Sequence, residues 1–391
     1  LDMPVVQQRK DKVVNQLATG VKGLLRKNKV TVFQGFGVLA SANKIALKDP
    51  AGKVTGEVQG KNILLATGSD CRDIPSLPCD HKVVINSDDI LKLPAVPKSL
   101  LVIGAGAVGS EFASIYRRYG SEVTLVEMMP TLVPVEDEEI GKALGEAFTK
   151  QGIKVKTETT VSALKVVGDR AEVVMKGKDG QEEKGTFDRV LVAIGRKPMT
   201  EGIGLETVGV KTDKGYVLHD PATFETNVKG IYAIGDIIKA PWLAHAASHE
   251  GIHVVTHLAG KETEPMNMDK VPNATYCYPE VASVGLTEKK AKERGYDVRI
   301  GKFPFVGNPK ALILDQTQGY FVKYVVDKKY DEVLGIHIIG PKATELLAAA
   351  GVALSHEATG QSMQNTVFAH PTLSEALGEA AHAVYGMAIH F

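Results

Sequence analysis

The feature that most constrains the fold is a glycine triplet between an apolar run and a helical pattern. Residues 100–103 form an apolar segment of strand length, and Gly104, Gly106 and Gly109 follow with the spacing GxGxxG. A second β-branched segment ends at Glu127, 23 residues after Gly104. The order strand, glycine-rich turn, helix, strand and acid is a dinucleotide-binding fingerprint. We therefore expect a βαβ unit that binds a dinucleotide.

Each glycine of the triplet has a steric role. Gly104 allows the tight turn, Gly106 lets a pyrophosphate approach the backbone, and Gly109 lets the helix pack close to the strand. The N–H groups in the first turn of the helix then hold the phosphates. Glu127 can accept a bond from a ribose 2′-OH but would repel a 2′-phosphate, and residues 128–130 supply no arginine. The cofactor should therefore be NAD rather than NADP.

Length and charge limit the class of protein. With 391 residues the chain is long enough for two to three domains. Its 46 basic and 46 acidic residues balance, which indicates neither a nucleic acid nor a membrane surface as partner. No apolar run approaches the ~20 residues of a membrane-spanning helix. The composition is that of an ordinary globular protein.

Three cysteines, Cys71, Cys79 and Cys277, form no disulfide framework and no metal-binding set. Cys71 and Cys79 lie in one proline-containing loop, so a bridge between them remains possible. Reduced thiols in a reducing compartment are the preferred interpretation.

The N-terminal part reads as a helix followed by β-structure. Apolar residues recur at helical spacing in residues 3–28, which predicts a basic amphipathic helix that packs on a core. Residues 29–61 predict an antiparallel meander of three short strands. Residues 62–69 predict a buried strand that ends in Thr-Gly.

This last strand has a counterpart near the end of the fingerprint domain. Residues 189–195 form another apolar strand closed by a glycine, which indicates two similar nucleotide-binding units. In the second unit Leu101 precedes Val190 by 89 residues, and the same distance before Leu64 lies upstream of the first residue. We therefore expect that the GxGxxG of the first unit is missing from this chain and that the natural protein is longer.

Two further regions complete the chain. Residues 230–234 form an apolar strand that ends in Gly235-Asp236, and a helical segment follows it. From about residue 266 the pattern changes to antiparallel strands and Ala/Leu-rich helices. This predicts a third domain of α+β type.

Taken in order, these motifs and the segment from His370 to Glu375 (His-Pro-Thr-Leu-Ser-Glu) resemble the flavin-dependent pyridine nucleotide–disulfide oxidoreductases. The resemblance covers essentially the whole chain, including residues 278–285 at the start of the third domain. Within the family the match is to the members that oxidise dihydrolipoyl groups. It implies an α/β fold with two Rossmann-like dinucleotide-binding domains, for FAD and NAD, and a C-terminal α+β dimerisation domain. The implied boundaries are 1–97 for the FAD-binding domain, 98–218 for the NAD-binding domain, 219–265 for the continued FAD-binding domain and 266–391 for the interface domain.

The resemblance also implies a flavin site. Asp236 would bond a hydroxyl of the ribitol or ribose, as a carboxylate at the end of a strand can. A helix that starts at residues 242–245 would point its positive end at the pyrimidine edge of the flavin. The implied FAD-binding residues are Gly37, Thr67, Gly68, Ser69, Gly235, Asp236, Trp242, Leu243, Ala244 and His245.

On the NAD side the glycine-rich turn would hold the pyrophosphate, with Glu111 near the nicotinamide and Glu127 at the adenosine ribose. Val161 and Gly195 would touch the adenine and nicotinamide regions, although core packing is the alternative for Val161. The implied NAD-binding residues are Gly104, Ala105, Gly106, Ala107, Val108, Gly109, Ser110, Glu111, Glu127, Val161 and Gly195.

His370 is the implied acid–base residue. Oxidation of a dithiol needs a group that removes a thiol proton and stabilises the thiolate, and imidazole can do both near neutral pH. Pro371 suits the first position of a helix, which would leave His370 at its cap. Glu375 could then bend back to orient the ring and favour the imidazolium. In this family the histidine acts on the disulfide of the partner subunit, so a homodimer is implied.

Several expectations concern what is absent. The family's redox cysteines, spaced CxxxxC, belong upstream of the first residue, and no cysteine here has that spacing, so this chain by itself should not complete thiol oxidation. Four histidines are spaced by four residues, as would suit a metal site: His245, His249, His253 and His257. The resemblance places them in a helix of the flavin domain, and we expect no metal.

The expected activity is oxidation of dihydrolipoyl groups through a redox disulfide and FAD, with hydride transfer to NAD⁺. The expected partners are the lipoyl domains of a 2-oxoacid dehydrogenase complex or of glycine cleavage. The expected location is the cytoplasm, with the mitochondrial matrix or a plastid as alternatives. A soluble pyridine nucleotide transhydrogenase stays open because it needs no disulfide, but it leaves His370 and Glu375 unexplained. A non-catalytic NAD-binding scaffold, which would carry no flavin, stays open if the chain is naturally this short.

Overall fold

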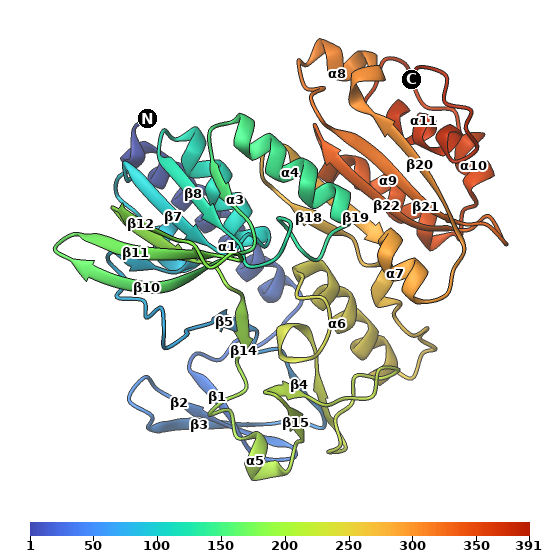
Figure 1. Ribbon diagram of the computed structural model, residues 1–391. Coiled ribbons are helices and arrows are strands. Elements are labelled where there is room, and N and C mark those ends of the chain that lie inside the picture. The colour runs from blue at the N-terminus through green and yellow to red at the C-terminus, as the bar shows by residue number, and fades with distance from the viewer. The chain divides into compact units, whose positions relative to one another are not determined.

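The computed structural model describes residues 1–391, whose elements Figure 1 traces in chain order. Two compact units account for the chain. The first contains Leu1–Arg72 and Arg196–Met268, and the second contains Asp73–Gly195 and Asp269–Phe391. Residues 196–218, which the sequence places with the NAD-binding domain, thus cluster with the first unit. None of the helices combines the length and the hydropathy that a membrane span needs.

The first unit begins with a long helix, α1 (Met3–Lys27). Asp2 caps the helix by accepting a hydrogen bond from the N–H of Val5 at 3.3 Å. The expectation that this helix packs on a core is wrong, because only Met3 is buried and Leu17 is 66% exposed. The later turns find no apolar surface to pack against within their unit, so the apolar stripe faces solvent.

The three-stranded meander predicted for residues 29–61 is confirmed. Its strands pair in the order β1-β2-β3, all antiparallel. Asp49 closes the second turn, since its Oδ1 accepts bonds from the N–H groups of Ala51 at 3.0 Å and Lys53 at 2.9 Å. The strands are β1 (Phe36–Ser41), β2 (Lys44–Lys48) and β3 (Val54–Gln59).

The first unit also contains two short strand pairs. Strand β4 (Ile63–Leu65) lies parallel to β17 (Ile231–Ala233), so their carboxyl ends share one edge. Strand β5 (Ser69–Cys71) lies antiparallel to β14 (Arg196–Pro198). A buried apolar cluster packs around β4 and β17. The other elements are α5 (Leu205–Val208), β15 (Thr212–Asp213), β16 (Tyr216–Val217), the 3-10 turn η1 (Gly235–Ile237) and α6 (Ala244–Leu258).

The second unit contains a five-stranded parallel sheet in the order β6-β13-β7-β8-β9. The predicted strand, helix and strand of the fingerprint are β7 (Ser99–Ile103), α3 (Ala107–Arg118) and β8 (Glu122–Val126). Leu100, Leu101 and Val102 are fully buried, as expected for a parallel sheet covered on both faces. The remaining elements are β6 (Val84–Ile85), α2 (Ser87–Ile90), α4 (Glu138–Lys150), β9 (Lys154–Lys156) and β13 (Arg189–Val192).

A separate antiparallel sheet is inserted between β9 and β13. Its strands follow one another in the order β10-β11-β12, which Figure 1 shows in green as a long hairpin with a third strand. Their bounds are β10 (Thr159–Val167), β11 (Arg170–Gly177) and β12 (Glu182–Phe187).

The C-terminal part of the second unit has the predicted α+β pattern. Five antiparallel strands pair in the order β18-β19-β22-β21-β20, and α9 and α11 pack on them. The strands are β18 (Asn273–Thr275), β19 (Glu280–Gly285), β20 (Val298–Pro304), β21 (Phe321–Asp327) and β22 (Val333–Gly340). The helices are η2 (Met268–Lys270), α7 (Glu288–Glu293), η3 (Phe305–Gly307), α8 (Pro309–Ile313), α9 (Ala343–Ser355), α10 (Gly360–Gln364) and α11 (Glu375–Ala383).

A buried ionic cluster ties this part to the parallel-sheet part of the second unit. Lys323 on β21 is 1% exposed, and its Nζ lies 2.9 Å from Asp137 Oδ1 and 2.8 Å from Glu288 Oε2. The neighbouring Glu136 is 8% exposed and accepts a bond from Asn273. Burial raises the pKa of Glu136 to about 6, although hydrogen bonds to its carboxylate act in the opposite direction.

Candidate functional site

The glycine-rich turn between β7 and α3 has the shape of a phosphate cradle. Gly104 has φ +96°, and a Cβ there would lie 2.5 Å from the carbonyl oxygen of Ala193. A Cβ at Gly109 would lie 1.8 Å from the carbonyl oxygen of Gly104, so only glycine allows this contact between helix and strand. At Gly106 a Cβ would meet nothing within 4 Å, and no side chain caps the helix. Open space above uncapped N–H groups fits a dinucleotide pyrophosphate.

Glu127 stands at the end of β8 and fixes this turn. It is 6% exposed, its Oε2 accepts a bond from the N–H of Ala105 at 2.7 Å, and its Oε1 accepts one from the N–H of Met129 at 2.8 Å. Buried Ser110 adds a bond from its Oγ to the carbonyl oxygen of Ala105 at 3.1 Å. Each carboxylate oxygen of Glu127 keeps a second lone pair, so the acid can still accept a ribose hydroxyl.

The other residues expected on the NAD side lie in different surroundings. Glu111 Oε1 accepts a bond from the N–H of Tyr276 at 2.9 Å, and burial raises the pKa of this carboxyl. Val161 packs against an apolar cluster, as in the alternative interpretation of this residue. Gly195 is exposed and lies between β13 and β14. It has φ +112°, and a Cβ there would meet nothing within 4 Å. Val161 and Glu111 are therefore held by protein contacts in this structure.

On the flavin side, Gly235 and Asp236 follow β17 in the turn η1. Ser69 Oγ donates a hydrogen bond of 2.5 Å to Asp236 Oδ2, which brings two of the expected FAD-binding residues together. Below the turn, Glu250 is fully buried, and its Oε2 accepts a bond from the N–H of Gly235 at 2.7 Å. Its Oε1 is buried with no hydrogen-bond partner, and burial raises the pKa of Glu250.

The start of α6 lies where the sequence expects a flavin contact. Leu243 is the N-cap residue, its side chain offers no hydrogen bond, and Ala244 and His245 are exposed. Trp242 is anchored just before the helix by a bond from its indole N–H to the carbonyl oxygen of Ile238 at 3.3 Å. The uncapped, positive end of a 15-residue helix suits negative charge on a reduced flavin.

A cavity of about 300 Å³ in the first unit gathers further expected FAD-binding residues. Gly37 from β1 and Thr67 from the end of β4 both line it, together with apolar side chains that include Leu39 and Ile203. Gly68 has φ +75°, and a Cβ there would meet nothing within 4 Å. The first unit thus offers a cavity with backbone and apolar walls, the carboxylate of Asp236 and the unpartnered Oε1 of Glu250. These features fit the nucleotide part of FAD.

His370 and Glu375 form the predicted pair. The Nδ1 of His370 lies 2.9 Å from Glu375 Oε1, and Glu375 Oε2 accepts a bond from the N–H of Thr372 at 2.7 Å. Burial raises the pKa of the Glu375 carboxyl, but its bonds to Thr372 and His370 outweigh this, and the net pKa lies below the ordinary value. The His370 side chain is 67% exposed, so its Nε2 is accessible.

One detail of the prediction at this pair is wrong. Helix α11 begins at Glu375 with Ser374 as its N-cap, so Pro371 is not the first helical residue. The Thr372 hydroxyl bonds back to the carbonyl oxygen of Ala369 at 2.6 Å, which forms a turn ahead of the helix. Glu375 therefore bends back from the first turn of the helix to His370, as expected, but the residues between the two form a turn and not a helix.

Two residues of the first unit were missed by the sequence analysis. Arg196 donates to both the hydroxyl and the carbonyl oxygen of Ser69, and Glu250 accepts a hydrogen bond from the N–H of Gly235. The only local signal for Arg196 was its place directly after Gly195. Neither contact follows from local sequence spacing, because Arg196 and Ser69 are 127 residues apart and Glu250 and Gly235 are 15 residues apart.

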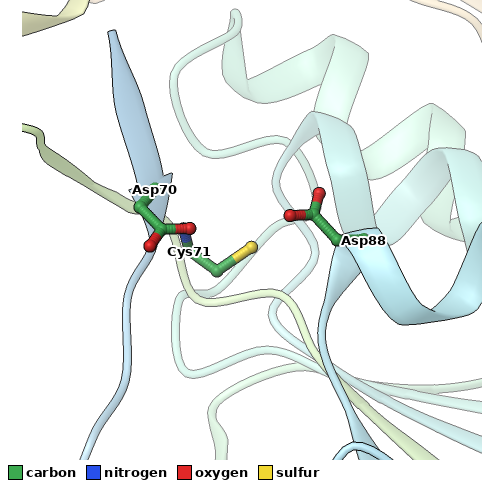
Figure 2. Close-up of side chains that lie close together, drawn as sticks. All are labelled: Asp70, Cys71 and Asp88. Carbon is green, nitrogen blue, oxygen red and sulfur yellow. The ribbon is translucent and has the colours of Figure 1, made fainter. Parts of the chain in front are cut away.

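The cysteines show no redox arrangement. Figure 2 shows Asp70 and Cys71, which end strand β5; Asp70 Oδ1 accepts a bond from the N–H of Cys71 at 2.7 Å. None of Cys71, Cys79 and Cys277 is in a disulfide, and burial raises the pKa of the Cys277 thiol far above its usual range. No role in thiol oxidation is assigned to them.

Comparison with known proteins gives matches that span nearly all of this chain. Residues 2–251 match the model described as pyridine nucleotide-disulphide oxidoreductase, and residues 271–381 match the dimerisation domain of the same group. The chain is 43% identical over 392 residues to a mitochondrial dihydrolipoyl dehydrogenase of Pisum sativum, covering 100% of this chain and 77% of the relative. It is 41% identical to a dihydrolipoyl dehydrogenase of Zymomonas mobilis, covering 100% and 83%. The crystal structure of LpdA from Mycobacterium tuberculosis aligns with a TM-score of 0.87 at 26% identity, covering 98% of this chain and 83% of the other.

Proposed function

The chain belongs to the pyridine nucleotide–disulphide oxidoreductase family, and from this premise we propose that the protein oxidises dihydrolipoyl groups to the lipoyl disulfide and delivers the electrons to NAD⁺. The observation that carries the proposal is identity of 40–43% to dihydrolipoyl dehydrogenases along the whole chain. The protein is an oxidoreductase that uses FAD and NAD, and its dimerisation domain makes it a homodimer.

His370 moves the proton in this proposal. Glu375 holds the Nδ1 side of the ring, so Nε2 is the nitrogen that takes a proton from a thiol of the substrate and later returns it. The negative charge of Glu375 stabilises the positive charge that the ring gains when it takes the proton. By resemblance to the family, this histidine serves the disulfide of the partner subunit.

The two nucleotide sites are proposed on the residues described above. Asp236, Ser69 and the uncapped start of α6 would hold and orient FAD, which supplies a two-electron carrier between a dithiol and NAD⁺. Gly106 would leave room for the NAD pyrophosphate, and Glu127 would accept the ribose hydroxyl. The surrounding protein would exclude water and fix the orientation of both nucleotides.

The finer partners belong to the same proposal. Lipoyl domains of a 2-oxoacid dehydrogenase complex would present the substrate, because a dihydrolipoyl group needs a protein carrier to reach a second enzyme. We place the protein in the cytoplasm; the mitochondrial location in the name of the Pisum sativum relative supports the matrix as the alternative.

Steady-state assays test this function. We expect the purified protein, with the upstream redox cysteines that the resemblance implies, to form NADH from dihydrolipoamide and NAD⁺. We expect it to use NADP⁺ at least about tenfold less well because Glu127 opposes a 2′-phosphate. We expect His370→Gln to lower kcat by about 10²-fold or more, the scale of general acid–base catalysis, with the KM for NAD⁺ unchanged. Hydride exchange between NADH and an NAD⁺ analogue without any turnover of dihydrolipoamide would favour a transhydrogenase instead.

A further inference from the structure

Arg196 is an unassigned residue that reaches into the proposed flavin site. It opens β14, directly after Gly195, and β14 pairs antiparallel with β5, which begins at Ser69. Its guanidinium makes two bonds to one residue: Nε donates to Ser69 Oγ at 2.7 Å and Nη2 donates to the carbonyl oxygen of Ser69 at 2.8 Å. The fork geometry of arginine suits such a double contact, and a lysine could not reproduce it.

The bonds at Ser69 have a defined direction. A hydroxyl has one proton and two lone pairs, and Arg196 can only donate, so Nε occupies a lone pair of Ser69 Oγ. The single proton of Ser69 is then committed to Asp236 Oδ2, at 2.5 Å. Without the guanidinium the hydroxyl could rotate away and leave Asp236 without this donor.

The turn before Ser69 is held by the same segment. Thr67 Oγ1 donates to the carbonyl oxygen of Met199 at 2.6 Å, and the N–H of Met199 donates to the carbonyl oxygen of Gly68 at 2.9 Å. Residues 196–199 therefore hold the whole turn 67–69, and Arg196 supplies the contact to the Ser69 hydroxyl. Asp236 receives its orientation from this chain of contacts.

We infer that Arg196 is a positioning residue for FAD: through Ser69 it holds Asp236 in the orientation that accepts a nucleotide hydroxyl. The inference rests on the proposed flavin site. Arg196 touches no part of the nucleotide in this inference, so its effect passes entirely through Ser69. This makes the two residues energetically coupled, which a double-mutant cycle measures.

The experiment titrates the apoprotein with FAD and follows quenching of flavin fluorescence, for the wild type, Arg196→Met, Ser69→Ala and the double variant. Each single change should raise the Kd for FAD about tenfold, the scale of one hydrogen bond to a charged group. The double variant should also stand about tenfold above the wild type, rather than about a hundredfold, because both changes break the same relay. Lys197→Met, one residue along and exposed, is the matched control and should stay within about twofold.

The outcomes separate the inference from the function. The inference would be overturned if Arg196→Met bound FAD with unchanged affinity, or if the two single-variant changes in binding free energy added in the double variant. The proposal that the protein binds FAD would stand in both cases. A wild type that takes up no FAD would overturn both. If Arg196→Met fails to fold by circular dichroism, Arg196→Lys replaces it in the cycle; it keeps the charge, loses the fork, and should show the same non-additivity with Ser69→Ala.

Discussion

Glu375→Gln is the change that probes the catalytic pair most selectively. The amide oxygen of glutamine can still accept a bond from His370 Nδ1, which lies 2.9 Å from Glu375 Oε1, so the ring keeps a partner. The change removes the charge and also the bond that Glu375 Oε2 accepts from the N–H of Thr372, because an amide NH2 group cannot accept it. A hydrogen bond to a charged group contributes about 1.5–3 kcal/mol. The His370 side chain is 67% exposed, so solvent screens the pair and the lower end applies. About 1.5 kcal/mol corresponds to roughly a tenfold lower kcat.

The assay is NADH formation from dihydrolipoamide and NAD⁺ at saturating substrates. The control is Glu379→Gln on the same helix, because Glu379 Oε1 lies 2.8 Å from Nδ1 of His390 in a pair of the same chemistry outside the proposed catalytic machinery. We expect the control to retain kcat within about twofold and both variants to keep the wild-type Tm within a few degrees. A Glu375→Gln enzyme with full kcat, or an equal loss in both variants, would refute the reasoning.

Three further predictions concern the second unit. Gly106→Ala should weaken NAD⁺ binding without changing the Tm, whereas Gly109→Ala, whose Cβ would lie 1.8 Å from a carbonyl oxygen, should lose about 1–3 kcal/mol of unfolding free energy as well; equal Tm values would contradict this. Lys323→Met leaves Asp137 buried without its cation and should cost about 3–5 kcal/mol in urea unfolding, and a cost below about 1 kcal/mol would argue against it. Burial raises the pKa of Glu136 from 4.5 to about 6, so the folded state binds this proton more tightly than the unfolded state does. The free energy of unfolding is therefore unaffected by Glu136 below pH 4.5 and is lowered by about 2 kcal/mol once the pH has risen through 6. Glu136→Gln should therefore gain about 2 kcal/mol relative to the wild type between pH 4 and pH 8 in denaturant titrations, and a pH-independent difference would exclude this account.

Local sequence patterns predicted most of the architecture. The apolar run at residues 100–103, the glycine spacing and the acid at Glu127 led to the correct strand, turn, helix and strand, because each follows from contacts close in the chain. The family, the α/β fold class with a C-terminal α+β domain, the activity and the cofactors FAD and NAD are confirmed by the comparisons. The nucleotide contacts of individual residues and the domain boundaries stay predictions.

The sequence analysis failed where a feature depends on burial or on pairing between distant residues, because local sequence patterns do not determine either. Helix α1 has the amphipathic spacing of a core helix, yet Leu17 faces solvent because the pattern cannot say what packs against it. The sequence analysis did not single out Lys323, because nothing near it in the chain indicates the three acids that surround it in the structure. Arg196 and Glu250 act on residues that are brought near only by the pairing of β5 with β14 and by the packing of α6.

The most direct test of the central claim is an anaerobic titration of the purified protein with dihydrolipoamide, followed by its visible spectrum and then by addition of NAD⁺. For the protein with the upstream redox cysteines that the resemblance implies, the account predicts a flavin spectrum, a long-wavelength thiolate-to-flavin band on titration, and reoxidation with formation of NADH. A protein without flavin, or a flavin that NADH reduces but dihydrolipoamide leaves unchanged, would contradict it.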